Sequence, residues 1–392
     1  MNYFLIVCSF STIFFIFSNA ASFSYPIERS GSLIQRLLKS GKYSEFLKSR
    51  NELKTGSQPF IDFYDDYYIL KVDVGTPAQS FRLSLDTASS FLWVLDINCI
   101  SKDCHGASNH GQKSTYNFSD SSTFIEGAGI FVAQFDGQSI SGYLGKETVS
   151  FGGLTLKNQD FGSAQLLPQL YVEQPIDGVI GFGFPAMAVN GTRTPLDGLM
   201  PMLDQQMFSV WMDRKIVTSR GGPGGLVTFG AMDTVNCFAD VNWVPLTVKS
   251  YWGFDLDGFK IGSYERTKKE KVISDTGSGW IGAPPTVISA IVKATGAKYD
   301  WNLELYVVPC STMKTQPDIK LTINGIEYTI PSVEYILDLL LDNGQCALTF
   351  FGFGATGFGP TWVLGDTFIR SYCHFYDYGN MRIGLAKAHH SY

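Results

Sequence analysis

Residues 84–90 read SLDTASS and residues 273–279 read ISDTGSG, so the chain contains two Asp-Thr turns that each continue into small residues. Each turn is followed later in the chain by two apolar residues and a glycine, at 179–181 and at 363–365. The separation between the turn and this glycine is nearly the same in both cases. One such turn is common by chance. The recurrence of the whole pattern in the same order indicates an internal duplication, and therefore two related halves.

The composition is that of a globular protein. The chain has 392 residues, of which 45% are hydrophobic and 17% are charged, with 40 Gly and 16 Pro, which excludes disordered, collagen-like and coiled-coil classes. A chain of this length is not expected to form a single hydrophobic core, so we expect two lobes. The formal net charge of -6, without a dense basic cluster, argues against a nucleic-acid partner, because phosphate binding requires a basic patch.

Strand-forming residues dominate from Tyr67 onward. Short runs of β-branched and aromatic residues alternate with Gly, Pro and Asn, which predicts a mostly β chain. No glycine-rich phosphate loop opens a helix after a strand, so no nucleotide cofactor is expected. Helical patterns are few and short, and we expect helices at about 196–206, 286–295, 333–341 and 366–371.

The first 20 residues are uncharged and almost wholly apolar, and they end in small residues, which predicts a signal peptide over 1–20. A membrane anchor is the alternative, although the run is short for a span. No later stretch is as long and apolar, so we expect no membrane span after signal removal.

The segment after the signal differs in charge from the rest. Residues 22–60 carry a net charge of +4 and residues 61–392 a net charge of -10. Apolar residues recur at helical spacing between Leu33 and Leu47, which indicates a basic amphipathic segment lying on an acidic body. An ordinary N-terminal helix is the alternative.

Six cysteines remain after Cys8, which lies in the expected signal, and an even number in an exported chain indicates three disulfides. Cys99 and Cys104 are close enough to form one small loop. Four cysteines remain, and they could pair in three ways. They are Cys237, Cys310, Cys346 and Cys373.

The five histidines lack the spacing of a zinc site, so we expect no metal cofactor and place all five at the surface: His105, His110, His374, His389 and His390. Asn117-Phe118-Ser119 and Asn190-Gly191-Thr192 are glycosylation sequons.

Several stretches resemble the pepsin-like aspartic proteases. They are YYILKVDVGTPAQSFRLSLDTASSFLWV at 67–94, IDGVIGFG at 176–183, SDTGSGWIGAPP at 274–285 and VLGDTFIRSY at 363–372. The likeness extends from about Tyr67 to Ala386. Residues 32–48, SLIQRLLKSGKYSEFLK, similarly resemble the basic propeptide of the zymogens of this family.

The resemblance implies a mostly β, bilobal fold with an active-site cleft between an N-terminal lobe at 61–240 and a C-terminal lobe at 241–392. It implies a monomeric endopeptidase that acts on peptides and proteins, needs no cofactor, and is secreted or lysosomal. Residues 21–60 would be a propeptide that inhibits the enzyme intramolecularly.

By the same resemblance, Asp86 and Asp275 form the catalytic dyad, one from each lobe. Two carboxyls that share a proton can both take a proton from water and give one to the peptide carbonyl, as hydrolysis without a metal or a covalent nucleophile requires. Alternatively each Asp could merely cap its turn, as Asp often does. The matched pair favours the dyad.

Other residues receive supporting roles from the resemblance. Thr87 and Thr276 would interlock across the lobe junction. Ser89 and Ser278 would lie beside the carboxylates as outer hydrogen-bond partners.

The family's disulfides correspond to Cys99–Cys104 and Cys310–Cys346. Cys237 and Cys373 have no counterpart in pepsin, and as the remaining exported pair they are expected to bond to each other.

Two departures from the family affect the site. Ala88 replaces a glycine and would strain the dyad if the backbone there required a positive φ. Phe135 and Asp136 replace the Tyr-Gly of the flap, the hairpin that closes over substrate, with Trp93 expected to pack beneath it. These departures support an alternative, a catalytically impaired homologue that binds peptides without cleaving them. A lectin or adhesion sandwich would not explain the duplicated turns.

Overall fold

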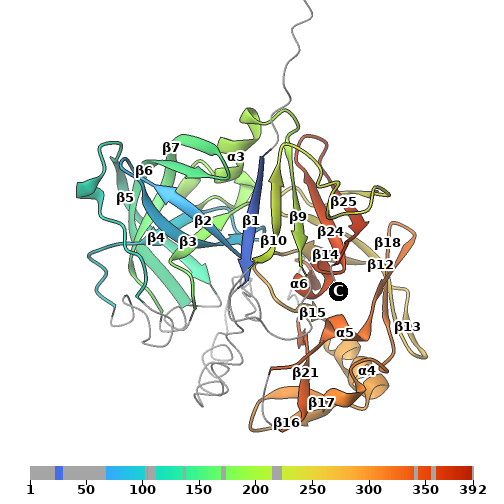
Figure 1. Ribbon diagram of the computed structural model, residues 1–392. Helices are drawn as coiled ribbons and strands as arrows, with labels where there is room; N and C mark the ends of the chain where they lie inside the picture. Colours follow the sequence, from blue (N-terminus) through green and yellow to red (C-terminus); the bar gives the residue numbers. More distant parts are fainter. Residues whose placement is uncertain are drawn as a thin grey trace, which may run out of the picture.

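Strands form about half of the described chain and are arranged in three sheets (Figure 1). The computed structural model describes residues 23–29, 68–101, 104, 112–135, 138–168, 174–213, 223–339, 343–354 and 359–390. The expected signal peptide, the amphipathic segment at 33–47 and Asp136 lie outside these residues. The predicted mostly β fold is confirmed.

The largest sheet has 13 strands and runs through the centre of the molecule into the first half (Figure 1). In spatial order its strands are β11 (Asn242–Pro245), β25 (Arg382–Lys387), β24 (Tyr372–Asp377), β9 (Met207–Met212), β10 (Pro223–Phe229), β1 (Phe23–Arg29), β2 (Tyr68–Val74), β3 (Gln79–Asp86), β8 (Gly178–Gly181), β4 (Leu92–Leu95), β7 (Leu154–Leu166), β6 (Gln138–Phe151) and β5 (Ile125–Phe135).

The second half contributes two further sheets. The eight-stranded sheet contains β19 (Ile326–Ile330), β18 (Ile319–Ile323), β12 (Gly253–Ile261), β14 (Glu270–Ser274), β23 (Trp362–Leu364), β15 (Ile281–Ala283) and β22 (Phe350–Gly352), with β13 (Tyr264–Arg266) paired to β12. The four-stranded sheet contains β16 (Lys298–Asp300), β17 (Leu305–Pro309), β21 (Gln345–Leu348) and β20 (Ile336–Leu337).

The helices are short, and the α-helices begin within one residue of the predicted starts. The α-helices are α3 (Pro195–Leu199), α4 (Pro285–Thr295), α5 (Ser332–Tyr335) and α6 (Asp366–Ile369). The 3-10 helices are η1 (Phe118–Asp120), η3 (Pro185–Met187), η4 (Val189–Gly191), η5 (Met200–Met202) and η6 (Cys310–Thr312). Among the described residues no helix is long and apolar enough to cross a membrane.

Helix α4 matches its predicted range and shows why. Its first turn begins with Pro285, its buried face includes Val287, Ile288 and Ile291, and Gly296 ends it with a left-handed φ of 68°. Each of these buried side chains stabilises the fold by about 1.5–3 kcal/mol relative to exposure.

The other helical predictions were too long. The helix expected at 196–206 becomes the 3-10 helix η5 at Met200, since Pro201 supplies no backbone donor for a continuing α-helix. The helix expected at 333–341 ends at Tyr335, because Ile336 and Leu337 pair with β21 as strand β20.

The duplicated sequence pattern is a duplicated strand arrangement. In the first half β3 runs parallel to β8, with Asp86 opposite Gly181, and in the second β14 runs parallel to β23, with Ser274 opposite Leu364. A Cβ on Gly181 would lie 2.6 Å from the Phe91 amide nitrogen, and one on Gly365 would lie 2.0 Å from the Ser278 carbonyl oxygen. The glycine that ends each pattern is therefore required by close backbone approach.

Strand β1 was not predicted. Residues 23–29 fall in the expected basic propeptide, before its amphipathic stretch, and they form a strand between β10 and β2 in the large sheet (Figure 1, dark blue). The sequence FSYPIER shows no clear alternation, and its pairing with Pro223–Phe229 is a long-range contact that local patterns do not reveal.

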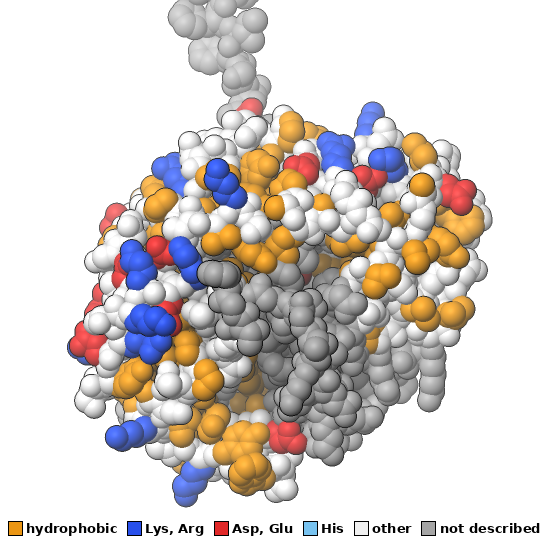
Figure 2. Space-filling view, turned by 180° about the vertical axis from the view of Figure 1, so that it is seen from behind, with side chains coloured by type: hydrophobic (Ala, Val, Ile, Leu, Met, Phe, Trp, Pro, Cys, Tyr) orange, Lys and Arg blue, Asp and Glu red, His pale blue; other side chains and the backbone are white. Residues whose placement is uncertain are grey.

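Charges of both signs are distributed over the described surface. The Lys269 ammonium lies 3.2 Å from the Asp257 carboxylate, and the Lys146 ammonium lies 2.6 Å from that of Asp160. On the face drawn in Figure 2, blue and red side chains are interspersed among apolar ones rather than gathered into one continuous basic surface.

Three disulfides close the described chain: Cys99–Cys104, Cys310–Cys346 and Cys237–Cys373. The last joins Cys373 on β24 to a residue 136 positions earlier in the sequence, whereas Cys99 and Cys104 are only 5 positions apart. Both Cys237 and Cys373 are buried in a small apolar cluster. This bond thus fixes the end of the first half to the central sheet.

We predict that replacing both Cys237 and Cys373 by Ala lowers the melting temperature more than replacing both Cys99 and Cys104. Loop-closure entropy gives about 5 kcal/mol for the long loop and about 2 kcal/mol for the short one. Thermal unfolding of the two double variants at one pH measures the difference. An equal or larger loss for the short loop would contradict this explanation.

Candidate active site

The two Asp-Thr turns place Asp86 at the end of β3 and Asp275 directly after β14. Asp86 Oδ1 accepts the backbone amides of Ala88 at 2.7 Å and Ser89 at 3.1 Å. Asp275 Oδ1 likewise accepts the amide of Gly277 at 2.8 Å. Such bonds also occur where Asp only shapes a turn, so the relation between the two carboxyls decides the role.

The two carboxyl groups face one point. A methyl group on Gly277 would lie 3.1 Å from both Asp86 Cγ and Asp86 Oδ1, and 3.2 Å from Asp275 Oδ1. Asp275 is buried and Asp86 is partly exposed. Turn-capping alone does not require two carboxyls from distant parts of the chain to meet in this way.

Burial raises the pKa values of both carboxyls, and the negative charge of Asp86 raises that of Asp275 further. For Asp86 burial raises the pKa, opposed by the side chain of Ser89 and by the amides of Ala88 and Ser89. For Asp275 burial and then the negative charge of Asp86 raise the pKa well above its ordinary value, while the Gly277 amide opposes the shift. A proton shared by this pair would therefore be retained to a higher pH than the proton of an ordinary carboxyl.

Thr87 and Thr276 join the turns reciprocally. The Thr87 hydroxyl donates to the Ser274 carbonyl at 3.0 Å and accepts the Thr276 amide at 3.0 Å. The Thr276 hydroxyl donates to the Leu85 carbonyl at 2.9 Å and accepts the Thr87 amide at 3.1 Å. Both threonines are buried, so these four hydrogen bonds fix one turn against the other.

The two serines differ in their contacts. The Ser89 side chain acts on Asp86 by lowering its pKa, but its hydroxyl makes no hydrogen bond of normal geometry among the described residues. The Ser278 hydroxyl donates to the Trp280 carbonyl at 3.2 Å. It is directed to the backbone of its own loop and not to the Asp275 carboxyl.

Ala88 causes no backbone strain of the kind considered above, since it is absent from the described non-glycine residues with positive φ. Its side chain is buried in an apolar cluster that also contains Phe91 and Trp93. The methyl group is therefore accommodated by packing.

The flap residues are only partly described. Phe135 is the last residue of β5 and pairs with Gln138 of β6, so it lies at the end of a hairpin, while Asp136 lies outside the described residues. Trp93 is buried in the same apolar cluster as Phe131 and Ile140, which come from the two strands of this hairpin. Trp93 thus belongs to an apolar cluster to which both strands of the hairpin contribute.

The expectation that all histidines lie at the surface was wrong for His374. It lies on β24, whose residues from Cys373 to Asp377 are all buried, and its exposed fraction is 0%. The apolar context of YCHFYD was the available signal, because a polar residue between buried strand positions is buried with them. Metal-ligand spacing alone carries no information on this burial.

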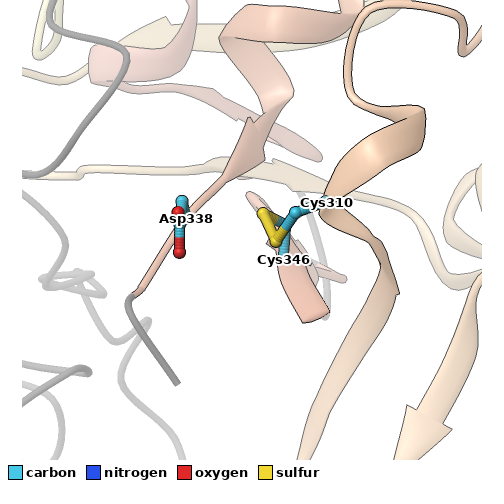
Figure 3. A group of neighbouring side chains, drawn as sticks. All are labelled: Cys310, Asp338 and Cys346. Atoms are coloured by element: carbon cyan, nitrogen blue, oxygen red, sulfur yellow. A yellow bond between two sulfur atoms is a disulfide. The ribbon is translucent and has the colours of Figure 1, made fainter. Parts of the chain in front are cut away.

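One cluster has the residue types of a metal site: Cys310, Asp338 and Cys346 (Figure 3). The two sulfur atoms are joined to each other as a disulfide, with Asp338 beside it. Since a thiolate is the sulfur species that binds metals, this cluster does not fit a metal ion.

Comparisons with known proteins agree with this geometry. The family model described as eukaryotic aspartyl protease matches residues 67–388. Aspartic protease 1 of Caenorhabditis elegans is 48% identical over 380 residues, covering 95% of this chain and 96% of that protein. Cathepsin E of Rattus norvegicus is 34% identical, with 93% of each chain covered, and pepsin A of Bos taurus is 34% identical, with 92% of this chain and 98% of that protein covered.

The chain therefore belongs to the eukaryotic aspartyl protease family, and it is an aspartic-type endopeptidase with the bilobal fold of that family.

We predict opposite outcomes for two exchanges of Ala and Gly beside the dyad. Gly277→Ala puts a methyl group 3.1 Å from the Asp86 carboxyl, closer than such contacts normally are, and should lower kcat about tenfold or more by displacing a carboxyl. Ala88→Gly should leave kcat within about twofold, because the methyl it removes is not strained.

Steady-state kinetics of the two purified variants on one peptide substrate would measure both effects. A clear loss of kcat in Ala88→Gly, or none in Gly277→Ala, would show that the dyad is not confined as described.

Proposed function

We propose that Asp86 and Asp275 are the catalytic dyad of an endopeptidase that works at acidic pH and is made as a zymogen. The observation that carries the proposal is that the two carboxyls face one point, with the Asp86 charge raising the pKa of Asp275. The Thr87 and Thr276 hydrogen bonds keep them in that relation.

The chemistry follows from one proton shared by two carboxyls. One carboxyl, ionised, takes a proton from a water molecule as that water attacks the peptide carbonyl carbon; the other, protonated, gives its proton to the carbonyl oxygen. Collapse of the tetrahedral intermediate breaks the C–N bond, and the amine nitrogen receives a proton as it leaves. The proton belongs to the pair, so we assign no fixed acid and base.

The secretory route is part of the proposal. A signal peptide at 1–20 would deliver the chain to the secretory pathway, and three disulfides fit an oxidising compartment. The destination would be extracellular or lysosomal. Asn117 and Asn190 would carry glycans: Asn190 is exposed and Asn117 partly so. The enzyme would act as a monomer on extended peptide segments.

The alternative of a binding protein without activity depended on Ala88 and on the flap. The backbone at Ala88 gives it no support, since φ there is not positive. The inactive-homologue alternative then depends on Phe135, which lacks the hydroxyl of the family's tyrosine. An assay of peptide hydrolysis distinguishes an active endopeptidase from a binding protein.

We predict that Asp86→Asn and Asp275→Asn each reduce peptide hydrolysis at pH 3–5 by at least about 10³-fold, because an amide cannot share the proton. A protein-substrate digest, with a statine-type dyad inhibitor on the wild type, measures the activity. Substantial cleavage by either purified variant would refute the dyad.

Stability provides the control for folding. A carboxyl whose pKa is raised in the folded state favours folding below its unfolded pKa, and that contribution is lost as pH rises through the folded pKa. Asp275→Asn removes this buried charge, so its melting temperature at pH 7 should equal or exceed that of the wild type. The difference should shrink toward pH 4.

We predict that acid releases the basic segment. Below pH ~5 the carboxylates of the body protonate while Lys and Arg stay charged, so the attraction between residues 22–60 and residues 61–392 weakens. The secreted precursor should be inactive at pH 7 and should shorten by about 35 to 45 residues on acidification, by cleavage between about Lys54 and Asp65.

N-terminal sequencing before and after acidification tests this. Residues 57–64, SQPFIDFY, lack the Lys-Tyr pair with which related zymogens cover the dyad, leaving Lys54 or Lys42 as substitutes, so latency should be weaker. High salt at neutral pH should loosen the segment by screening. A full-length form that cleaves substrate in acid with its N-terminus intact would refute the inhibitory role.

A further inference from the structure

A buried polar cluster lies directly behind the Asp275 turn. Ser274 Oγ lies 2.7 Å from His374 Nδ1 and 2.8 Å from the Tyr376 hydroxyl. All three side chains are buried, with exposed fractions of at most 1%. We refer to Ser274, His374 and Tyr376 as the polar triad. Since buried polar groups are costly unless they are paired, the triad must either be satisfied internally or serve another group.

The proton positions in the triad follow from His374. Its Nε2 has no hydrogen-bond partner among the described residues, while Nδ1 has Ser274. Burial lowers the pKa of His374 to about 3, so the ring is neutral through most of the acidic range. A buried N–H without an acceptor is rare, which assigns the ring proton to Nδ1.

This tautomer orders the remaining hydrogen bonds. With Nδ1–H donating to Ser274 Oγ, the Ser274 hydroxyl donates to the Tyr376 oxygen. Burial raises the pKa of Tyr376, and the nearby side chains of Ser274 and Thr87 oppose that rise. The side-chain hydrogen bonds therefore join His374, Ser274 and Tyr376, and the Ser274 carbonyl, which accepts the Thr87 hydroxyl, connects them to the threonine pair that joins the lobes.

Ser274 connects two sheets through different atoms. Its carbonyl accepts the Thr87 hydroxyl, and its side chain contacts two residues of β24. In the described strands β14 pairs with β12 and β23, whereas β24 pairs with β9 and β25. The Ser274 side chain thus ties the strand before Asp275 to the central sheet.

The first half has no such tie at the matching positions. Leu85 stands before Asp86 as Ser274 stands before Asp275. The β9 residues opposite His374 and Tyr376 are Val210 and Phe208, which are apolar and buried. The polar triad is therefore specific to the Asp275 side.

We propose that Ser274, His374 and Tyr376 are positioning residues that hold Asp275 against Asp86. The proposal rests on the proposed dyad and adds the device that sets its spacing. The triad acts through Thr87 and the Ser274 backbone. Its disruption lets the second turn move relative to the first.

The test uses Ser274→Ala and Tyr376→Phe in the full-length chain after acid activation. Each should lower kcat about tenfold with KM within about twofold, because substrate contacts are unchanged while the carboxyls are misplaced. Tyr376→Phe keeps the ring stacked 4.5 Å from Phe208 and so removes little besides the hydroxyl. The double variant should lose less than the product of the two single losses, because both residues act in one chain of hydrogen bonds.

The pH profile supplies a readout that a structural role would not move. When the carboxyls separate, each raises the pKa of the other less, so the basic limb of kcat/KM should shift to lower pH. Asp275 and Asp366 both act electrostatically on Tyr376, and His374 is the third titratable group there. A rescue variant checks the donor: His374→Asn retains an N–H near Nδ1 and should recover most of the activity that His374→Leu loses.

Tyr372→Phe is the matched control. Tyr372 lies on the same strand, two residues before His374, but its hydroxyl bonds to β19, to the Thr329 amide at 2.9 Å and the Thr329 carbonyl at 3.1 Å. This variant should change the melting temperature but neither kcat nor the pH profile.

Triad variants that behave like this control, or that change KM alone, would overturn the proposal. If Ser274→Ala does not fold, Tyr376→Phe decides by the same criteria. Failure of the dyad itself is recognised separately, by activity in Asp86→Asn or Asp275→Asn.

Discussion

The reciprocal hydrogen bonds of Thr87 and Thr276 are the constraint on which the rest of the site depends. Each hydroxyl satisfies a carbonyl and an amide across the junction, and both lie in surroundings from which water is excluded. Breaking one bond would leave buried groups unsatisfied on both turns, so the arrangement resists partial loosening. Two carboxyls that repel each other are held together by neutral groups below them, not by any attraction of their own.

The apolar residues around the two carboxyls and the backbone amides of the turns have opposite effects on the carboxyl pKa values. The cluster that contains Ala88, Phe91 and Trp93 supplies burial, which favours the protonated carboxyl. The amides of the turns supply the opposing stabilisation of charge. In the proposed dyad, the balance between burial and these amides would allow two aspartates to retain a shared proton.

Sequence patterns anticipated the features that depend on local backbone geometry. The duplicated turns, and the glycines that answer them at 181 and 365, follow from close approach between neighbouring strands, so they leave a repeated signature in the chain. The end of helix α4 follows similarly from Gly296. Features set by distant pairing left no such trace. Strand β1 depends on residues 223–229, and the burial of His374 depends on which face of β24 meets Ser274.

If acid removes residues 22–60 as proposed, the loss of strand β1 has a consequence for the lifetime of the cleaved enzyme. It lies between β10 and β2, so the precursor reaches its native sheet with Phe23–Arg29 in place. A chain that later loses this strand lacks residues that were present when the sheet formed. Once unfolded, it would have to refold without them. Its durability would then rest on a high barrier to unfolding, a kinetic stability, rather than on an equilibrium to which it can return.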